Sequence, residues 1–342
     1  MSKSSTTIYD IAAKLKVTPS TVSRALSDHP RISSKTKQAV KSIAQQMNYQ
    51  HNGIAAALRS GQTHIIGVLL PMVNRSFFSS VVKGIEQVAR VAGYNVMITQ
   101  SNDKEENERS IISAMLKTQV DGVIASIARE TTNFSHYQNI LDKKIPLILF
   151  DRVTEITDAS TVVIDDYLGA YKATEHLIHQ GCKRIAHFSG TQNLNIYKDR
   201  ERGYREALKN NGIVFEEDLL IQSNVKLEDG RTGMERLLLL DQPPDAIFAA
   251  SDYSAIGAMQ ILKERKMKIP DDVALVGFAD EAFANFVDPE LSSVNQMSEQ
   301  MGQFAAKIFL EQTKDRELSF IPSRTVLTPK LMIRKSSLKK SI

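Results

Sequence analysis

The sequence has almost none of the cysteines that stabilise secreted proteins through disulfides, and it lacks the long apolar runs that cross membranes. It has one cysteine, Cys182, and no tryptophan. A single thiol excludes a disulfide framework within the chain, as is usual for proteins of the reducing cytoplasm. We expect Cys182 to be a solvated or half-buried structural thiol. Residues 1–7 lack the apolar core of a secretory signal, and no apolar run approaches the roughly 18 residues that span a membrane. We therefore expect a cytoplasmic protein with no membrane partner.

Sequence signatures of common enzymes are also missing. The chain contains no G-x-G-x-x-G, no G-x-x-x-x-G-K-[ST] and no G-x-S-x-G, which removes the usual dinucleotide, nucleotide-phosphate and serine-hydrolase motifs. His176 and His179 are three positions apart on a predicted helix, but no cysteine or carboxylate completes a zinc site, so a solvated helix face is the better interpretation. We expect no enzymatic activity, no metal and no cofactor.

Charge is concentrated at the amino-terminal end, although the net charge of the chain is only +4. Residues 1–63 carry nine lysines and arginines against two acids, Asp10 and Asp28. The remainder is therefore slightly acidic, and this asymmetry indicates a polyanion partner for the amino-terminal part alone. A chain of 342 residues suits a small module followed by a larger two-lobed one.

The basic segment has the pattern of three short helices, over residues 7–15, 18–26 and 33–48. Thr18 is a natural N-cap, and Pro19 suits the first helical position, where a missing N–H costs nothing. Apolar residues at helical spacing give the first two helices one inward face each. Small hydroxyl side chains and Arg24 are left on the outer face of the second helix, which can approach the groove of DNA. The pattern predicts a helix-turn-helix.

A fourth segment, residues 52–60, favours a helix through its alanines but is shorter than the roughly 12–15 residues that an isolated helix needs. Gly53 weakens it further. We expect it to become helical only when something packs against it, and Leu58 is its one large apolar residue near the end.

From residue 64 onward, short apolar runs alternate with longer amphipathic ones. This β-α-β alternation with buried strands predicts parallel sheets. Two similar doubly wound lobes should leave a cleft at the carboxyl ends of their strands, where ligands settle. The predicted strands are 64–70, 95–99, 122–125, 146–150, 162–164, 184–188, 246–250 and 273–278. The predicted helices named by residue are 77–92, 105–117, 167–179, 197–209, 230–240 and 253–265.

The head resembles that of the lactose/galactose-repressor (LacI/GalR) family of bacterial transcription factors. The matching residues are Thr7-Ile8, Asp10-Ile11-Ala12, Thr21-Val22-Ser23-Arg24-Ala25-Leu26-Ser27, Asn48-Tyr49, Asn52, Ala55 and Leu58. The resemblance implies paired hinge helices that fold on operator DNA, with Leu58 driven between base pairs in the minor groove. It places DNA contacts at Thr7, Tyr9, Thr18, Pro19, Ser20, Thr21, Ser23, Arg24, Arg31, Asn52, Ala55 and Leu58. The alternative for Leu58 is a linker leucine packed on the body.

The body resembles the periplasmic sugar-binding protein fold that this family uses as its sensor. The expected fold class is therefore α/β, with a three-helix helix-turn-helix head, a hinge helix and a two-lobed body of doubly wound parallel sheets. The expected domains are 1–50 for the head, 51–63 for the hinge and linker, and 64–342 for effector binding and dimerisation. Crossovers near residues 162, 290 and 323 would give one lobe about 64–162 with 291–323, and another about 163–290 with 324–340.

The resemblance also places an effector site in the cleft. Arg200 matches the family's R-x-x-G-[YFW] arginine, within Arg200-Glu201-Arg202-Gly203-Tyr204. The planar guanidinium group of arginine can donate to hydroxyl, carboxylate or phosphate groups equally well. The alternative for Arg200 is an ion pair on a helix surface. The remaining candidates are Asn74, Phe77, Phe78, Asp151, Ser251, Asp252 and Asp280. Ala279 stands where many members have an effector-binding aspartate, and Asp280 is the candidate to compensate. Without tryptophan, any stacking on a ring would fall to phenylalanine or tyrosine.

Together these features predict a cytoplasmic, DNA-binding transcriptional regulator, in this family most often a repressor. Its partners would be double-stranded operator DNA, a small-molecule effector such as a sugar or related metabolite, and a second copy in a homodimer. No heptad repeat follows Ser337, so no tetramerising helix is expected. The alternative is a sugar-binding receptor without a regulatory role, which would need an export signal. A dehydrogenase-like enzyme ranks third because the dinucleotide fingerprint is missing.

Overall fold

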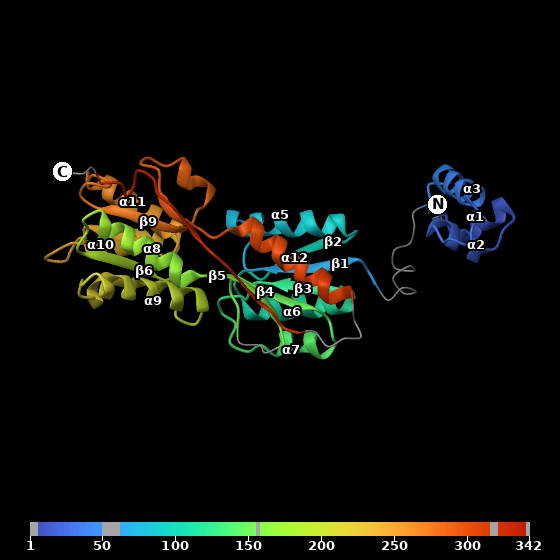
Figure 1. The fold of residues 1–342 in the computed structure, drawn as a ribbon, viewed down its shortest axis with the longest axis horizontal. Coiled ribbons are helices and arrows are strands. Elements are labelled where there is room, and N and C mark those ends of the chain that lie inside the picture. The colour runs from blue at the N-terminus through green and yellow to red at the C-terminus, as the bar shows by residue number, and fades with distance from the viewer. Residues whose placement is uncertain (1–5, 50–61, 155–157, 315–320, 340–342) are drawn as a thin grey trace. The chain divides into compact units, whose positions relative to one another are not determined.

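A computed structural model describes residues 6–49, 62–154, 158–314 and 321–339 (Figure 1). The chain divides into two compact units, residues 1–63 and 64–342, which are considered separately below as the head and the body. Within the described residues, no helix has the length and apolar character needed to cross a bilayer.

The head contains the three predicted helices: α1 (Ile8–Leu15), α2 (Pro19–Leu26) and α3 (Ser34–Gln46). Thr18 caps α2 as expected, with its side-chain oxygen accepting a hydrogen bond from the Thr21 N–H at 3.2 Å. A small core joins the three helices, and its fully buried members are Ile11, Val22, Ala25 and Val40. The predictions for Asn52, Ala55 and Leu58 fall outside the described residues.

The body contains two six-stranded sheets. The first has the order β11-β5-β4-β3-β1-β2 and is parallel throughout. Its strands are β1 (Ile65–Leu70), β2 (Asn95–Gln100), β3 (Gly122–Ala125), β4 (Leu147–Phe150), β5 (Ser160–Ile164) and β11 (Arg324–Leu327). We call this sheet and its helices lobe 1. The helices are α5 (Ser76–Val91), α6 (Glu105–Lys117), α7 (Ser135–Asp142) and α12 (Ser298–Lys314).

The second sheet, with its helices, forms lobe 2. It has the order β12-β10-β9-β8-β6-β7, and only the edge strand β12 is antiparallel. Its strands are β6 (Ile185–Ser189), β7 (Leu220–Gln222), β8 (Ala246–Ala249), β9 (Ala274–Ala279), β10 (Ser292–Asn295) and β12 (Lys330–Met332). Its helices are α8 (Asp166–His179), α9 (Asn195–Asn210), α10 (Leu227–Leu237) and α11 (Asp252–Glu264), with 3₁₀ turns at Glu217–Leu219 and Ala282–Asn285.

The chain passes between the lobes three times, each time a few residues later than the sequence suggested. The crossings follow β5, β10 and β11. Residues 292–295, expected in lobe 1, pair with β9 in lobe 2. Residues 324–327, expected in lobe 2, pair with β5 in lobe 1. Both segments are short strands that complete a sheet before the chain leaves it, so the assignment by sequence was wrong for them.

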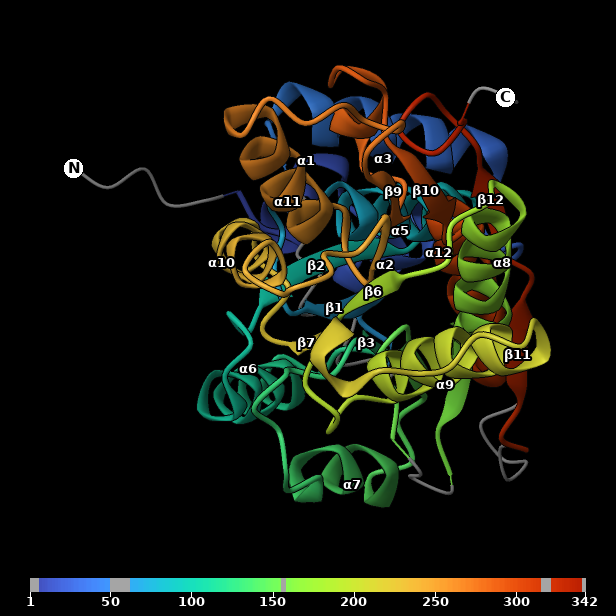
Figure 2. The ribbon, with the colours of Figure 1, turned by 90° about the vertical axis from the view of Figure 1, so that its left-hand side faces the viewer.

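Helix pairs pack tightly on the sheets, and the pairs α5 with α12, α8 with α9 and α10 with α11 are visible in Figures 1 and 2. Glycine permits the closest of these approaches. A Cβ on Gly84 would lie 2.1 Å from the Glu299 carbonyl oxygen, and one on Gly302 would lie 2.0 Å from that of Val81. The two helices α5 and α12, distant in sequence, therefore meet backbone to backbone in lobe 1.

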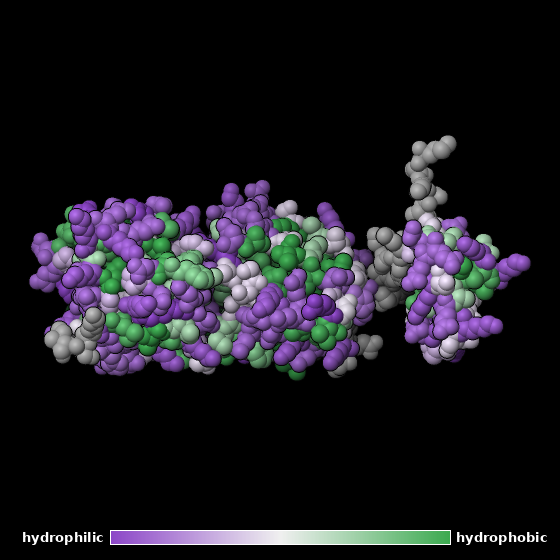
Figure 3. Space-filling view, turned by 90° about the horizontal axis from the view of Figure 1, so that it is seen from above, coloured by the Kyte–Doolittle hydropathy of each residue, from purple (hydrophilic) through white to green (hydrophobic). Residues whose placement is uncertain are grey.

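Two surface expectations were wrong. Cys182 is only 2% exposed, and burial raises the pKa of its thiol to about 11. His176 is 9% exposed and makes a 2.8 Å hydrogen bond between its Nε2 and the Ser337 hydroxyl. The C-terminal segment covers this face of α8, which helical spacing alone did not reveal. Elsewhere hydrophilic side chains dominate the visible face, with apolar patches between them (Figure 3).

Candidate functional site

The outer surface of α2 presents the side chains predicted to contact DNA. Thr18, Ser20 and Arg24 are exposed, while Pro19, Thr21 and Ser23 are partly exposed. The hydroxyl of Thr18 lies 2.9 Å from those of both Ser20 and Thr21, so the beginning of α2 is a compact cluster of small polar groups. Such a surface can approach a base edge or a phosphate closely.

Neighbouring parts of the head add further exposed groups. Thr7 and Arg31 are exposed, and the ring of Tyr9 is 69% exposed. The two acids of the head are both occupied. Asp10 accepts hydrogen bonds from the N–H and hydroxyl of Thr7, and Asp28 pairs with Lys37 at 3.1 Å.

A cleft between the two lobes is the candidate effector site. It holds about 620 Å³ of space not filled by protein atoms, part of it open to solvent. Five of the predicted residues line it: Phe77, Phe78, Asp151, Arg200 and Ser251. The carboxyl ends of β1, β4, β6 and β8 precede these side chains or their helices, as expected for open parallel sheets.

Three predicted residues do not line the cleft. Asn74 lies on the exposed turn before α5. Asp252 is fully buried, accepting hydrogen bonds from the Ser293 hydroxyl at 2.6 Å and the Glu281 N–H at 2.7 Å. Asp280 forms a 2.7 Å ion pair with Arg334 and accepts a hydrogen bond from Asn295. Asp280 therefore does not replace the missing acid at position 279, where Ala279 itself lines the cleft.

Several lining residues were not predicted. Asp103 follows β2, and Arg152 directly follows Asp151 after β4, so the rule that ligands gather at the carboxyl ends of strands could have found both. Gln296 follows β10, a strand that the sequence analysis did not identify. The other unpredicted polar lining residues are Arg75, Arg129, Tyr197, Asn224, Tyr253 and Glu281.

Arg200 is held by the protein on several sides. Its Nε donates to Asp166 at 2.7 Å, one Nη donates to the Ala250 carbonyl oxygen at 2.8 Å, and the other reaches Gln296 at 3.4 Å. The guanidinium also lies 3.7 Å from the centroid of the Phe278 ring. Burial raises the pKa of Asp166 to about 7 despite the attraction of Arg200. The arginine is thus fixed at the wall of the cleft rather than swinging freely.

On the lobe 1 wall, two arginines share one carboxylate. Arg152 Nη1 lies 2.5 Å from one Asp103 oxygen, and Arg129 Nη2 lies 3.2 Å from the other. Burial raises the pKa of Asp103, but Arg152 and Arg129 outweigh that effect and hold the pKa below its usual value. For Asp151 the balance is reversed, because burial raises the pKa more than Arg152 and Arg200 lower it.

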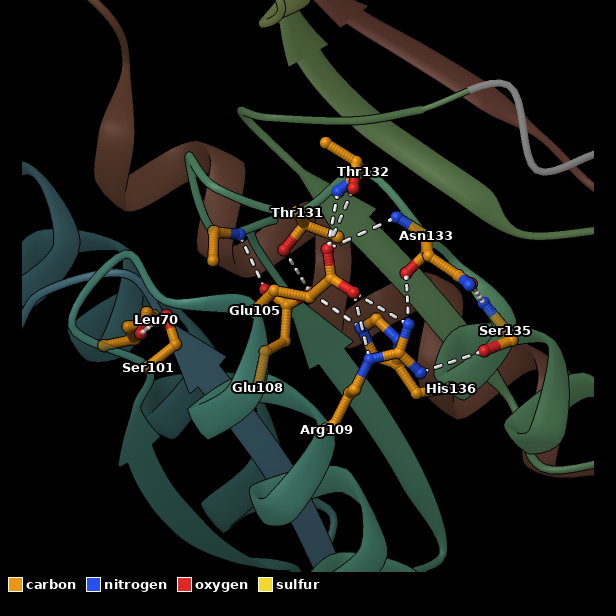
Figure 4. A network of polar contacts seen from close by, with 11 residues as sticks. Leu70, Ser101, Glu105, Glu108, Arg109, Thr131, Thr132, Asn133, Ser135 and His136 are labelled. Atoms are coloured by element: carbon orange, nitrogen blue, oxygen red, sulfur yellow. Dashed lines mark hydrogen bonds and ion pairs between the residues drawn. The ribbon is translucent and has the colours of Figure 1, made fainter.

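A polar network behind the cleft fixes the loop that carries Arg129 (Figure 4). Glu108 of α6 is fully buried and accepts hydrogen bonds from the Ala128 N–H at 2.6 Å, the Thr131 hydroxyl at 3.0 Å and His136 at 2.8 Å. One turn earlier, Glu105 binds the N–H groups of residues 132 and 133, and these bonds lower its pKa to about 2. Loop 126–134 is therefore tied to α6 along its length.

Direct contacts join the lobes beside the cleft. Arg129 donates to Asn224 at 2.9 Å, and Asn193 donates to the Arg129 carbonyl oxygen at 2.6 Å. On another side, the Glu281 carboxylate accepts hydrogen bonds from the N–H and the hydroxyl of Ser76 at the start of α5. We call this second contact the Ser76–Glu281 clasp. Next to it, Arg75 lies 3.5 Å from the centroid of the Tyr253 ring.

Two family profiles match the chain and cover most of it. Residues 7–52 match the bacterial regulatory proteins of the lacI family, and residues 63–329 match the periplasmic binding proteins and sugar-binding domain of the LacI family. The chain is similar to the transcriptional regulator DegA of Bacillus subtilis, with 32% identity over 97% of this chain and 98% of that protein. It is also similar to catabolite control protein A of Priestia megaterium, with 28% identity over 93% and 97% of the two chains.

Solved structures agree with the fold. A complex of the transcriptional regulator CelR with cellobiose has 27% identity and a TM-score of 0.74, covering 97% of this chain and 99% of that one. The lac repressor dimer, bound to operator and an anti-inducer, has 22% identity and a TM-score of 0.87 over 98% and 100% of the two chains, which supports the fold alone. The relatives are regulators of transcription rather than enzymes. The chain belongs to the lacI family of bacterial regulatory proteins and is a DNA-binding transcriptional regulator.

Proposed function

We propose that two copies of this chain form a homodimer in the cytoplasm, bind a pseudo-palindromic operator through their heads, and repress transcription under the control of a small molecule bound between the lobes. The observation that carries the proposal is the presence in one chain of a polar α2 surface with the exposed Arg24 and a cleft lined by polar side chains. The lac repressor, which has the same fold, is a dimer on its operator.

At the DNA, the hydroxyl cluster of α2 enters the major groove and Arg24 binds a phosphate or a guanine edge. Tyr9 and Arg31 contact the DNA backbone or bases. Leu58 provides the minor-groove wedge carried over from the family, together with Asn52 and Ala55. Neither Pro19 nor Ser20 can make a bidentate base contact, so the operator sequence depends on other contacts and on DNA shape.

At the cleft, a sugar or related metabolite is the proposed effector. Phe77 and Phe78 offer apolar faces, while Asp151, Arg200 and Ser251 offer polar groups from both lobes. A ligand that touches both lobes favours the closed arrangement over the open one. The effector changes operator affinity only to the extent that its own affinity differs between these two states.

A salt titration of DNA binding, with the full-length protein and operator-containing fragments, tests the proposal. Binding should weaken steeply as salt rises, because phosphate contacts release counterions. A thermal-shift screen of sugars, sugar phosphates, nucleosides and purines then identifies the effector class. Each stabilising compound is added to the operator assay to give the sign of its effect. No DNA binding at low salt would favour a sugar-binding receptor without a regulatory role.

A further inference from the structure

Several hydrogen-bond acceptors around the cleft are already occupied by the protein. Asp103 accepts from Arg129 and Arg152, and Glu281 accepts from Ser76. The side-chain oxygens of Asn224 and Gln296 accept from Arg129 and Arg200. A neutral sugar, whose hydroxyl groups need acceptors as well as donors, would find few of these oxygens free.

Arg152 has the opposite character, because it is a buried donor with unused capacity. It lines the cleft and is 8% exposed, yet its Nε has no hydrogen-bond partner among the described residues. A buried donor of this kind costs free energy unless a ligand or water accepts from it. The guanidinium is held in place by Asp103 through Nη1, so its remaining edge is pre-oriented.

The charges favour an anion at this edge. Among the arginines that line the cleft, Arg200 is already paired with Asp166, whereas Arg129 and Arg152 share the single carboxylate of Asp103. Arg75 has no carboxylate within ion-pair distance in the described part of the chain and instead lies over Tyr253. On lobe 2, the uncharged Ala279 lines the wall, and the carboxylate of the neighbouring Asp280 is paired with Arg334 and Asn295.

We propose that the effector of this protein carries an oxyanion, a carboxylate or a phosphate on a sugar-like body, and that Arg152 binds that group beside Arg129. This inference rests on the function proposed above and specifies its ligand class. The oxyanion accepts from Arg152, the sugar-like body lies toward Phe77 and Phe78, and Asp103 is a positioning residue that fixes both arginines. Planar guanidinium groups match carboxylate and phosphate geometry, which gives the charged group both affinity and orientation.

Matched pairs of compounds test the proposal by calorimetry on the full-length protein. The pairs are glucose with gluconate, glucose with glucose 6-phosphate, and ribose with ribose 5-phosphate, with inorganic phosphate as a separate probe. At least one anionic compound should bind at least tenfold more tightly than its neutral parent, as expected for a charge-assisted hydrogen bond. Comparing gluconate with the phosphates tells which oxyanion the site prefers.

Variants locate the effect at Arg152. Arg152→Gln should bring the anionic and neutral compounds to within about threefold of each other, since both the charge and the Nε donor are lost. Arg152→Lys keeps the charge and should retain part of the preference, which covers the case in which the glutamine variant does not fold. Arg231→Gln, whose ion pair with Glu264 lies outside the cleft, is the matched control and should leave the preference unchanged.

Several outcomes would overturn the inference. They are neutral sugars binding as tightly as their anionic partners, no anionic compound binding, inorganic phosphate matching the sugar phosphates, or an unchanged preference in both Arg152 variants. A neutral sugar that binds and alters operator affinity would leave the proposed function intact. Ligands that bind the cleft without any change in operator affinity would contradict the proposed function instead.

Discussion

At the scale of single residues, the environment of Arg200 changes what its removal should do. As a proposed effector-binding residue, Arg200 should be needed for the effector response, so Arg200→Ala should abolish that response. In the structure, Asp166 is 4% exposed and depends on Arg200 for its ion pair. Removing one partner of a buried pair leaves an uncompensated group, so the variant should affect stability as well as ligand binding.

We expect Arg200→Ala to lower the free energy of unfolding by about 3–5 kcal/mol, the usual cost of breaking a buried ion pair. The double variant Arg200→Ala with Asp166→Asn should recover at least half of that loss, because the isolated carboxylate is gone. Urea denaturation of the three proteins measures both values. Equal stability of the single and double variants would show that the Asp166 charge is not the source of the cost.

Two buried acids make stability depend on pH. Burial raises the pKa of Asp252 to about 7 against the hydrogen bonds of Ser293 and Glu281, with Glu281 and Asp280 adding repulsion, and it raises that of Asp166 to about 7 against Arg200. Raised carboxyl pKa values mean that the folded state holds protons that the unfolded state has released. The stability that the protonated forms of Asp252 and Asp166 contribute is therefore lost as the pH rises from about 4 through about 7.

Asp252→Asn should accordingly flatten the fall in melting temperature between pH 5 and pH 8. His187 acts in the opposite direction, because burial lowers its pKa to about 4. Its protonation in the unfolded state therefore lowers the stability of the fold as the pH falls below about 6.5. Comparing the slopes of the wild type and the variant removes this common contribution. Parallel slopes would mean that Asp252 remains ionised throughout.

At the scale of elements, α2 should account for part of the salt dependence of operator binding. Replacing the exposed Arg24 by Gln is expected to reduce the log–log salt slope by about one for each head, if this residue contacts a phosphate. Fluorescence anisotropy at several salt concentrations gives the slope. Arg236→Gln, an exposed arginine of α10 in lobe 2, is the control, and the assignment of α2 fails if both variants behave alike.

The hinge segment offers a second test at this scale. Leu58→Ala should weaken operator binding because the methyl of alanine cannot wedge between base pairs as leucine does. Effector affinity should stay nearly constant, since the proposed site lies in the body. Anisotropy on operator DNA and calorimetry with the effector measure the two quantities. An unaltered operator affinity would refute the wedge role.

Most of the longer elements were predicted from the sequence, but the 17-residue helix α12 was not, and several short strands were also missed. The three helices of the head and the alternating strands and helices of the body follow from apolar spacing that each segment carries in itself. The missed strands β7, β10, β11 and β12 have only 3 or 4 residues. They lack the continuous apolar run that marks the four-residue strands β3, β4 and β8. Strand β10 contains the fully buried Ser292 and Ser293, whose hydroxyl groups donate hydrogen bonds to the Arg334 carbonyl oxygen and the Asp252 carboxylate.

The sequence predicted where in the fold the cleft lies, but not which side chains point into it. Ser251 and Asp252 are adjacent at the beginning of α11, yet Ser251 lines the cleft and Asp252 turns into lobe 2 toward Ser293. Asp280 was selected for its closeness to Ala279, but Arg334, 54 positions away, holds it elsewhere. Such partners are distant in sequence, so no local pattern reveals them.

At the scale of the whole body, the Ser76–Glu281 clasp should influence how far the lobes open. Its two hydrogen bonds to a carboxylate are of the kind that contributes about 1.5–3 kcal/mol each. Glu281→Ala should increase the open population and weaken effector binding about tenfold or more. Glu264→Ala, which breaks only the exposed pair with Arg231, is the control.

Energy transfer between dyes can follow the opening. Val91 and Leu239 are 90% and 86% exposed and lie in lobe 1 and lobe 2 respectively, so cysteines placed there accept labels. The native Cys182 is buried and its thiol pKa is raised to about 11, so it should not compete. Lower transfer efficiency in Glu281→Ala is expected, and identical efficiency in both variants would remove the clasp from the mechanism.

The three crossings also have a consequence for how the protein is made. As the chain emerges from the ribosome, the head has all of its described helices once residue 46 is out. Neither lobe is complete until β11 and β12 have followed, at residues 327 and 332. A nonsense codon near residue 290 would therefore leave an intact head attached to two unfinished lobes. Late truncations should give products that are cleared by proteolysis rather than regulators freed from their effector.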